Sequence, residues 1–518
     1  MRIALAITPY FTNGDSPPLG LTYISTVLRE AGHDVNCYDL IHFTLRDYEP
    51  FFAHFRRLVN LGIVGRRVTF LLNPEFTLFA LYQDAFRDVK HLLPENLSIK
   101  SGWVAGAMML KQLSIRWASM ILEHDPEIIM LSTYSSNLFS TLPLALELKK
   151  KTSAPIILGG PGVGLVEIYQ LVLATGIVDG IVVGEGERTV VELAQAIRKN
   201  RVISSCPYVD GVVSTNSPLT PRAQIMNLDD LPAPIFDGLP AYGLNLKDYE
   251  ALSENPYKSP FFVGLPVMAS RGCANRCSYC SESAFWNKWR IRNPQALANE
   301  IKLLKEKTGR DVFLFCDSAL NLNPFWLSDF CEKVIPLNIR FLSYMVAHPD
   351  LDENLARKMY KAGWRGAIVG VETFSDRLRK LVHKNSSRVD AMNTIRALAR
   401  ANIWVKANIL CGFPTETEDD VNETIRAIEK LNSESDVKRR LWWDAGHPLR
   451  LEPYSLMFNK PDKYNIKIVP YFLELPPRLS AIQPFVDRIT LKWDPGFSEE
   501  VVEQRSKRLI EISANPLE

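Results

Sequence analysis

The strongest constraint on the fold is a repeated alternation of short apolar runs with amphipathic segments, which occurs in two blocks of the chain. The first block opens with the run Ile3–Ile7, a helical pattern that closes at Gly32, and a second run, VNCYDL. Strands separated by single helices build parallel sheets. Residues 1–213 are therefore predicted to form a doubly wound, Rossmann-like α/β domain.

A segment at about residues 42–123 interrupts this first block. Its apolar residues recur at helical spacing and it carries no clear strand pattern, so we expect a helical insertion. The alternation then resumes with EIIMLS, PIILGG and VDGIVV, each followed by a helical pattern.

A proline-rich stretch without a consistent period, at residues 214–262, predicts a linker between the two blocks. Six further apolar runs alternate with helices after it: LPVMAS, DVFLFCDS, IRFLSYMV, GAIVGVE, WVKANILCG and LRLEPYS. Six βα repeats predict a partial TIM barrel, (βα)6, over residues 263–455. Residues 456–518 form a C-terminal region of mixed character.

Charge and hydropathy exclude several partners. The 518 residues include 60 Lys and Arg against 58 Asp and Glu, which gives a net charge of +2 without blocks of like charge. We therefore expect no nucleic-acid partner. The chain shows neither a signal-peptide pattern nor an uncharged apolar stretch of about 18 residues, so we expect a cytoplasmic protein that does not contact membranes.

Three of the eight cysteines, Cys273, Cys277 and Cys280, form a C-x3-C-x2-C motif directly after the first strand of the second block. Such a loop lies at the C-terminal mouth of the barrel, where these folds place their chemistry. Iron–sulfur clusters are normally held by four thiolates, so three leave one iron open for a ligand. A structural zinc loop is the alternative, although zinc sites usually have a second pair of ligands and none follows here.

This spacing, with Tyr279 before the last cysteine, resembles the signature of the radical S-adenosylmethionine (SAM) superfamily. The resemblance implies a [4Fe-4S] cluster on the three cysteines, SAM bound to the open iron, and reductive cleavage of SAM. It also implies an external one-electron reductant such as flavodoxin or ferredoxin.

The same resemblance implies SAM contacts at the ends of the barrel strands. Glu372 ends the fourth strand, and NILCGFPTET matches the fifth-strand segment that lies along the adenine in that family. Asp317 and Ser343 follow the second strand and end the third; Asp317 could instead cap the next helix, and Glu372 could be a solvated strand end. The predicted SAM-binding residues are Tyr279, Asp317, Ser343, Glu372, Asn408, Gly412 and Pro414. Cys316, Cys331 and Cys411 are expected to be buried and receive no role.

Three loops rich in glycine and serine follow strands of the first block, namely LSTYSSN, GGPGVG and GEGE. Open parallel sheets bind ligands at the carboxyl ends of their strands, and a generic nucleotide-binding domain is one interpretation. With PPLGLTYI, however, the loops resemble the cobalamin-binding domain that precedes the barrel in one radical SAM subfamily. The predicted cobalamin-binding residues are Leu19, Gly20, Ser132, Tyr134, Ser135, Ser136, Gly159, Gly160, Pro161, Gly162, Gly184, Glu185, Gly186 and Glu187.

The chain departs from other cobalamin proteins because it has no Asp-x-His-x-x-Gly motif. The resemblance therefore implies cobalamin without a histidine ligand beneath the cobalt, with Tyr134, Ser135 and Ser136 as the candidates that face it.

The resemblance implies a methyltransferase that acts on an unactivated carbon of a small molecule or natural-product intermediate. Cyclisation, ring rearrangement and methylation at phosphorus use the same parts, and the fold does not decide among them. A non-enzymatic cobalamin or Fe–S sensor is a remote alternative, against which the complete cysteine motif argues. A methylthiotransferase would need further cluster cysteines, for which Cys37 and Cys206 lack the spacing. We expect substrate contacts from the insertion and from the C-terminal region, with Trp442 and Trp443 just before it; a role of these aromatic residues in the core is the alternative.

Overall fold

The computed structural model describes residues 1–8, 17–40, 99–134, 137–164, 166–200, 208–237, 239, 264–286, 288–449, 451, 455–470, 491–494 and 496–513. The described residues group into two compact units. The first unit contains those of Met1–Ile225, Pro232–Ala241 and Pro470–Thr490. The second unit contains those of Met226–Leu231, Tyr242–Val469 and Leu491–Glu518.

The first unit is built on a six-stranded sheet in the order β2-β1-β3-β4-β5-β6. The first five strands are parallel and β6 is antiparallel to β5. The order 2-1-3-4-5 is the flavodoxin-like variant of doubly wound sheets. The strands are β1 (Arg2–Ile7), β2 (Asp34–Asp39), β3 (Ile128–Ser132), β4 (Ile156–Gly159), β5 (Gly180–Val182) and β6 (Val212–Val213).

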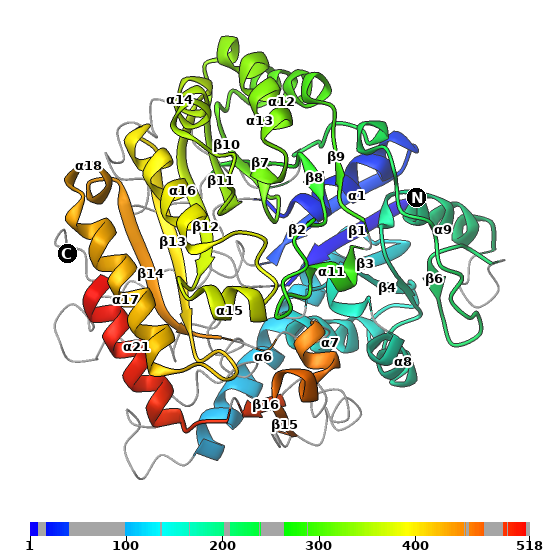
Figure 1. Ribbon diagram of the computed structural model, residues 1–518. Coiled ribbons are helices and arrows are strands. Elements are labelled where there is room, and N and C mark those ends of the chain that lie inside the picture. Colours follow the sequence, from blue (N-terminus) through cyan, green and yellow to red (C-terminus); the bar gives the residue numbers. More distant parts are fainter. Residues whose placement is uncertain are drawn as a thin grey trace, which may run out of the picture. The chain divides into compact units, whose positions relative to one another are not determined.

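The helices of this unit pack in pairs (Figure 1): α1 (Leu19–Glu30) lies against α9 (Gly186–Asn200), and α6 (Ile99–Leu122) against α7 (Leu138–Lys149). A further helix, α8 (Val166–Ala174), precedes β5. The central strand β1 is apolar on both faces, as a strand covered by helices on both sides must be. Helix α6 lies in the predicted insertion, whose residues 42–98 are outside the described residues.

The second unit is built on six parallel strands in the order β14-β13-β12-β11-β10-β7. This sequential, all-parallel arrangement confirms the predicted α/β architecture with a six-stranded barrel-type sheet. The strands are β7 (Leu265–Val267), β10 (Val312–Phe315), β11 (Arg340–Val346), β12 (Trp364–Glu372), β13 (Trp404–Cys411) and β14 (Leu441–Pro448).

The sixth strand differs from the prediction. LRLEPYS was expected to form it, but the strand is β14, which begins eight residues earlier at Leu441 and contains both Trp442 and Trp443. The two tryptophans and the following polar residues hide the alternating pattern. As a result, Leu441–Pro448, which lie before the predicted strand, form the last strand of the sheet.

Helices of the second unit lie along one side of the curved sheet (Figure 1). Most begin at an Asn, Asp, Ser or Thr whose side chain accepts a hydrogen bond from the first turn, as N-cap residues do. The main helices are α12 (Pro294–Thr308), α13 (Pro324–Val334), α14 (Glu353–Ala362), α15 (Asp376–Leu381), α16 (Arg388–Arg400), α17 (Glu418–Ser433) and α21 (Glu499–Ser513). Shorter elements are α11 (Glu282–Phe285), α18 (Ser435–Lys438), α19 (Leu456–Asn459), the hairpin β8 (Ser270–Arg271) and β9 (Arg290–Ile291), and the strands β15 (Lys467–Pro470) and β16 (Leu491–Asp494).

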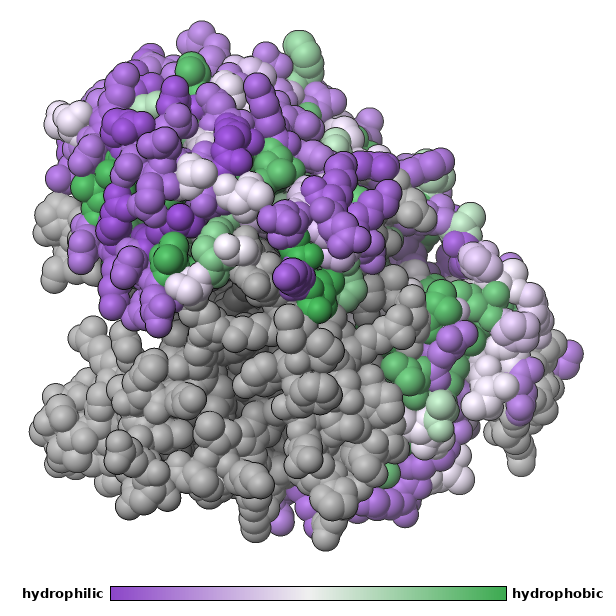
Figure 2. Space-filling view, turned by 60° about the horizontal axis from the view of Figure 1, so that its bottom comes forward, coloured by the Kyte–Doolittle hydropathy of each residue, from purple (hydrophilic) through white to green (hydrophobic). Residues whose placement is uncertain are grey.

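On the face that Figure 2 shows, the described surface is largely hydrophilic and carries a few groups of apolar side chains. Phe325, at the start of α13, is the most exposed of the large apolar side chains, with 86% of its surface accessible. Within the described ranges, no helix has the length and apolar character needed to cross a membrane.

The glycines that end α12 and α14 provide a matched test of the packing. Both have positive φ, but a side chain on Gly363 would approach the carbonyl oxygen of Ile339 to 2.1 Å, whereas one on Gly309 would meet nothing within 4 Å. We expect Gly309→Ala to cost about 1 kcal/mol of unfolding free energy, and Gly363→Ala to cost at least about 2 kcal/mol more, because the backbone must move. Urea unfolding of both variants measures the difference, and equal losses would contradict the described contact.

Candidate functional site

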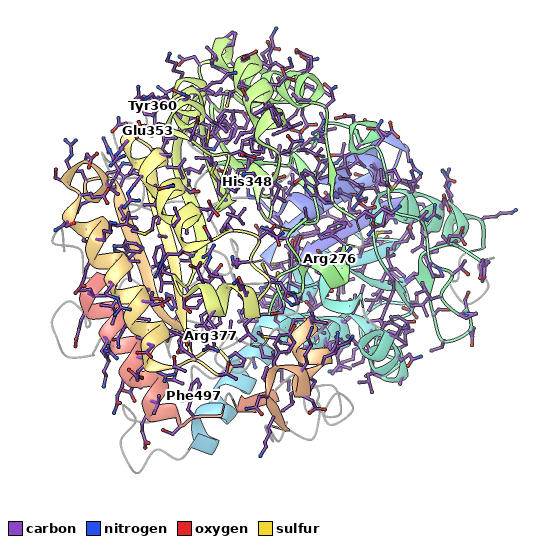
Figure 3. All side chains as sticks on the ribbon, viewed as in Figure 1. Arg276, His348, Glu353, Tyr360, Arg377 and Phe497 are labelled. Atoms are coloured by element: carbon purple, nitrogen blue, oxygen red, sulfur yellow. The ribbon has the colours of Figure 1, made fainter. Side chains whose placement is uncertain are left out.

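The three clustered cysteines lie on the loop between β8 and α11, beyond the carboxyl end of β7. Gly272 opens this loop at φ +83°, and a side chain there would come within 2.9 Å of the carbonyl oxygen of Lys288. Only glycine fits such a position. Figure 3 labels Arg276, which lies on the same loop between Cys273 and Cys277.

Backbone hydrogen bonds hold the cysteine loop from two directions. The Ser278 N–H donates to the carbonyl oxygen of Val382 at 3.0 Å, and the Ser278 carbonyl oxygen accepts from the Met457 N–H at 2.8 Å. The Asn385 side-chain amide donates to the Asn275 Oδ1 at 2.7 Å. The segment after α15 and helix α19 therefore fix the loop through protein contacts alone.

The thiols on this loop are partly buried. Burial raises the pKa of the Cys273 thiol to about 11 and that of Cys280 to about 12. The thiolates are thus unfavourable without a positive ligand, and metal binding would release their protons.

In the described part of the chain, no three His, Cys, Asp or Glu side chains converge on one ion position. A [4Fe-4S] cluster does not need three side chains at one ion position, because each thiolate binds a different iron atom.

Glu372 ends β12, as predicted, in the left-handed backbone conformation with φ +68°. Its carboxylate is not solvated: Lys384 Nζ donates to Glu372 Oε1 at 3.2 Å and to the Gly370 carbonyl oxygen at 3.0 Å. The Lys384 side chain is only 5% exposed, and the Glu372 side chain is 13% exposed. Burial, with the Glu372 carboxylate beside it, raises the pKa of Tyr279 well above its ordinary value. Glu372 and Lys384 therefore form a largely buried pair, with the partly buried Tyr279 of the cysteine loop beside it.

Lys384 was missed by the sequence analysis, because it lies in a loop and belongs to no motif. Its loop is anchored by the buried Arg379, which donates to the carbonyl oxygens of Val371 and Thr373 at 2.9 Å and to that of Ser386 at 2.8 Å. Only this tertiary anchoring brings Lys384 to Glu372.

Asp317 follows β10 and is buried, but its carboxylate is engaged by the segment that leads into the cysteine loop. Its oxygens accept from the Ala269 N–H at 3.0 Å and from the Ser270 hydroxyl at 2.5 Å. Burial raises the pKa of Asp317 to about 6. The capping alternative is wrong for this residue, since Asn323 caps α13. Asp317 supports the cysteine loop, and its predicted SAM contact stays a prediction.

The placement of Ser343 at a strand end is wrong. Strand β11 continues to Val346, and the Ser343 hydroxyl is buried and accepts from the Trp364 indole N–H at 2.9 Å. The alternating pattern of the strand simply extends further than the polar residue suggested. Cys316, which was expected to be buried, is exposed, whereas Cys331 and Cys411 are buried.

Asn408 lies on β13, level with Gly370 on β12 and Asp444 on β14. Its Oδ1 is buried and has no hydrogen-bond partner among the described residues. An unsatisfied buried acceptor is costly, so a donor from a bound ligand would suit this position. Gly412, just after the strand, has φ +75°, and Pro414 is buried.

The face of β13 that carries Asn408 is partly exposed and also carries Lys406, whereas Ala407 is buried on the face that packs against α16. Lys406 Nζ lies 2.7 Å from Asp444 Oδ2, and His447 Nε2 lies 2.6 Å from Asp444 Oδ1. Although burial opposes it, hydrogen bonds from His447 and Lys406 lower the pKa of Asp444 to about 2.

The adjacent Trp442 and Trp443 lie on opposite faces of β14. Lys406 Nζ lies 5.6 Å from the centroid of the Trp442 ring, on the partly exposed face. Trp443 is buried and donates its indole N–H to Asn432 Oδ1 of α17 at 2.9 Å. Trp443 is a core residue, and the prediction of a substrate contact remains only for Trp442.

In the first unit, the loop after β3 is tied to the end of β1, at the point where the strand order reverses. Asn137 Oδ1 accepts from the Tyr134 N–H at 2.7 Å, and the Asn137 side-chain amide donates to the Thr8 carbonyl oxygen at 3.1 Å. Ligands of doubly wound sheets bind at this position. Sequence analysis did not single out Asn137 or Thr8, while Ser135 and Ser136 lie outside the described residues.

The glycines of the next loops have different roles. A side chain on Gly160, which has φ +99°, would come within 2.4 Å of the Thr133 carbonyl oxygen, so this glycine allows the loops after β3 and β4 to touch. Gly20 and Gly184 are open on this side, since an added side chain would meet no atom of the described residues within 4 Å. This open backbone at the carboxyl edge fits a large ligand.

Other predicted cobalamin contacts have a packing role. A side chain on Gly186 would come within 3.0 Å of Ile24 of α1, so this glycine serves the contact of α1 with α9. Glu185 accepts from the Ile225 N–H at 2.6 Å. Leu19 begins α1, Ser132 ends β3, and Gly159, Pro161, Gly162 and Glu187 lie at or after the ends of β4 and β5. Their contacts with cobalamin stay predictions.

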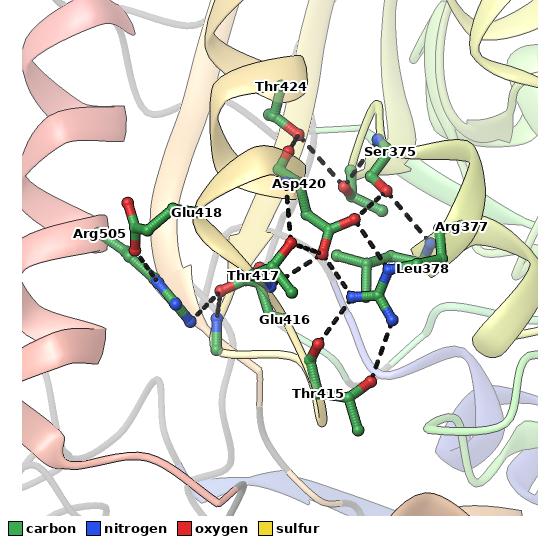
Figure 4. A network of polar contacts seen from close by, with 12 residues as sticks. Ser375, Arg377, Leu378, Thr415, Glu416, Thr417, Glu418, Asp420, Thr424 and Arg505 are labelled. Carbon is green, nitrogen blue, oxygen red and sulfur yellow. Dashed lines mark hydrogen bonds and ion pairs between the residues drawn. The ribbon is translucent and has the colours of Figure 1, made fainter.

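The segments that follow β12 and β13 are joined by Asp420 of α17 (Figure 4). Asp420 Oδ1 accepts from the Ser375 hydroxyl at 2.5 Å, Oδ2 accepts from the Thr417 N–H at 2.8 Å, and Arg377 forms an ion pair with the carboxylate. Although burial opposes it, hydrogen bonds from Arg377 and Ser375 lower the pKa of Asp420 to about 2. This carboxylate therefore links the segments after β12 and β13, near Glu372 and Gly412.

Residues 267–428 match the radical SAM superfamily. An uncharacterized methyltransferase of Pyrococcus horikoshii is 26% identical over 61% of this chain and 66% of its own length. An anaerobic magnesium-protoporphyrin IX monomethyl ester cyclase of Synechocystis is 26% identical over 60% of each chain. The chain thus spans less than two thirds of the length of these relatives.

Two solved structures share the fold. The radical SAM methyltransferase TsrM of Kitasatospora setae, with cobalamin and a [4Fe-4S] cluster bound, has a TM-score of 0.62 at 17% identity, covering 99% of this chain and 91% of its own. The cobalamin-dependent SAM radical enzyme OxsB has a TM-score of 0.54 at 14% identity, covering 89% of this chain and 55% of its own.

The second unit therefore contains a radical SAM domain, and the predicted resemblance to that superfamily is confirmed. The chain as a whole has the fold that cobalamin-dependent radical SAM enzymes share.

The cysteine loop makes a direct prediction. Changing Cys273, Cys277 and Cys280 together to Ala is expected to abolish iron and sulfide binding in anaerobically reconstituted protein, because no thiolate remains on the loop. Cys331→Ala, on the buried face of α13, is the control and should keep its full iron content. Iron and sulfide that persist in the triple variant would refute the assignment.

The Asp420 network predicts a pH dependence of stability. The folded-state pKa of about 2 lies below the ordinary value of 3.8, so the stabilisation is complete above pH 3.8 and is lost as the pH falls toward 2. The shift corresponds to about 2 kcal/mol of unfolding free energy. Asp420→Asn should lose this stability at pH 7 and flatten the acid limb of the curve, while the exposed Asp419→Asn should not. Denaturant unfolding between pH 2 and pH 7 measures both, and identical curves for the two variants would contradict the role of Asp420.

Proposed function

We propose that this chain is a cobalamin-dependent radical SAM methyltransferase that acts on an unactivated carbon of a small molecule or natural-product intermediate. The observation that carries the proposal is the cysteine loop, which protein contacts hold at the carboxyl end of a six-stranded parallel sheet. The buried Glu372–Lys384 pair stands beside it. The doubly wound sheet of the first unit, with its glycine-containing loops, supports the cobalamin assignment.

In this proposal Cys273, Cys277 and Cys280 hold the [4Fe-4S] cluster, and the first unit holds cobalamin. When bound, the cluster supplies the electron for cleavage of SAM and cobalamin supplies a methyl carrier. The protein contributes burial, position and charge around these groups.

The residues around the loop have distinct tasks in SAM binding. The Lys384 ammonium and the Glu372 carboxylate offer a buried donor and acceptor for charged groups of SAM, while Tyr279 lies beside them. The unpaired Oδ1 of Asn408 accepts a donor from the ligand. Gly412 allows the backbone to approach a flat ring closely.

The first unit binds cobalamin through the loops after β1, β3, β4 and β5. Gly20 and Gly184 leave their backbone open, and Asn137 holds the loop that carries Tyr134. The described histidines of this unit, His33 and His124, precede β2 and β3 rather than following a strand. This placement supports cobalamin binding without a histidine beneath the cobalt.

We propose that the substrate contacts the partly exposed face of β13 and β14, where Lys406, Asp444 and Trp442 lie on the same side as Asn408. A small molecule suits this surface because its polar and aromatic groups lie close together. Flavodoxin or ferredoxin would supply the electron. The balanced charge of the chain supports a protein without nucleic-acid or membrane partners.

A cyclase or ring-rearrangement enzyme is the second candidate. The similarity to anaerobic magnesium-protoporphyrin IX monomethyl ester cyclases favours it, and the same cofactor sites would serve that chemistry.

Product analysis separates the two candidates. A methyltransferase of this type consumes SAM in two ways, so each turnover is expected to release both S-adenosylhomocysteine and 5′-deoxyadenosine. With methyl-deuterated SAM, the product from a cell extract should gain the labelled methyl group. Cys280→Ala should abolish 5′-deoxyadenosine, because the cluster loses a ligand. An unlabelled product formed with 5′-deoxyadenosine but without S-adenosylhomocysteine would favour the cyclase and overturn the methyltransferase.

A further inference from the structure

The C-terminal helix α21 reaches the segment that follows β13 through a buried ion pair. Arg505 Nη1 lies 3.2 Å from Glu416 Oε2, and the two side chains are only 7% and 3% exposed. Glu416 belongs to the segment Gly412–Glu416, which continues β13 into α17. Residues about ninety positions apart are thus joined out of contact with water.

The Glu416 carboxylate connects this ion pair to a single peptide group. Glu416 Oε2 also accepts the N–H of Gly412 at 2.9 Å, and Gly412 has φ +75°. Burial raises the pKa of Glu416 to about 7, so its charge depends on the neighbouring guanidinium. The orientation of the Gly412 peptide therefore depends on a carboxylate that Arg505 neutralises.

Arg505 is itself held in place. Its Nε donates to Glu418 Oε1 at 2.9 Å, as Figure 4 shows, and its guanidinium lies 4.7 Å from the centroid of the Phe497 ring. Beside Arg505, the Ser506 hydroxyl donates to the Gly446 carbonyl oxygen of β14 at 2.6 Å. Helix α21 therefore makes polar contacts near the carboxyl ends of the neighbouring strands β13 and β14.

Apolar contacts would suffice if α21 only covered the sheet. Val502 already lies against Gly412, and Ile510 against Gly446. A buried ion pair is a poor way to gain stability, because both charges lose their water. Its particular effect is to define the direction of one N–H group on the segment proposed to bind SAM.

We infer that Arg505 is a positioning residue for SAM, which acts through Glu416 to hold the Gly412 segment in its binding conformation. This inference rests on the proposed function, and it assigns to the C-terminal region a role in cofactor binding. Arg505 does not touch SAM in this arrangement.

The test uses the full chain, reconstituted with its cluster and cobalamin. Arg505→Met removes the partner of Glu416, and Arg505→Lys keeps the charge but loses the fork that reaches both Glu416 and Glu418. Arg508→Met is the matched control, because Arg508 lies on the same helix and pairs with Glu418 at the surface. The dissociation constant of SAM is measured by equilibrium dialysis, together with iron content, cobalamin content and the melting temperature.

We expect Arg505→Met to weaken SAM binding by about tenfold to a hundredfold, as loss of a supporting partner does at other sites. Arg505→Lys should lie between this variant and the wild type, and Arg508→Met should bind SAM like the wild type. Iron and cobalamin contents should stay unchanged, which a general loss of structure would not allow.

Each outcome decides one question. If the cluster-loaded wild type does not bind SAM, the proposed function fails. If the wild type binds SAM and folded Arg505→Lys and Arg505→Met bind it equally tightly, the inference about Arg505 is wrong while the proposed function stands. If Arg505→Met does not fold, Arg505→Lys decides, with wild-type affinity overturning the inference.

Discussion

The hydrogen bonds that hold the cysteine loop are the interaction on which the rest of the site depends. A backbone held in one conformation brings three cysteines close in sequence toward one cluster at a smaller ordering cost. Ser278 supplies this through bonds to Val382 and Met457, and Asp317 does the same at the base of the loop. Burial keeps the Cys273 and Cys280 thiols protonated until a metal binds and releases their protons.

Charged side chains likewise hold the segments that follow β12 and β13. Arg379 anchors the segment that brings Lys384 to Glu372, Asp420 joins the segments after β12 and β13, and Arg505 reaches the second of these from the C-terminal helix. Each of these residues is charged, buried to a large extent and matched by several partners, as charges inside a protein must be. Together they form a supporting layer outside the residues proposed to contact SAM.

The loops that carry the proposed ligand contacts lie at the carboxyl edges of two sheets of mainly parallel strands, one in each unit. Parallel strands bring all their carboxyl ends to one edge, so loops far apart in sequence meet there. In the first unit this edge carries Asn137 and open glycines, and in the second it carries the cysteine loop, Glu372 and Gly412. The residues that organise each edge, such as Asn137 and Asp420, differ from those proposed to touch the ligands.

The sequence by itself determined the two α/β blocks, the cysteine motif and the ends of most strands, because apolar periodicity and local spacing record which face of each element is buried. It misplaced the last strand, since Trp442 and Trp443 hide the alternation, and it placed Ser343 at a strand end that lies further on. Only the tertiary structure decided that Lys384 meets Glu372 and that Arg505 meets Glu416. These contacts depend on how separate elements pack against one another, which no local pattern of residues encodes. Once both charges are buried, each needs its partner, because an unpaired buried charge is costly.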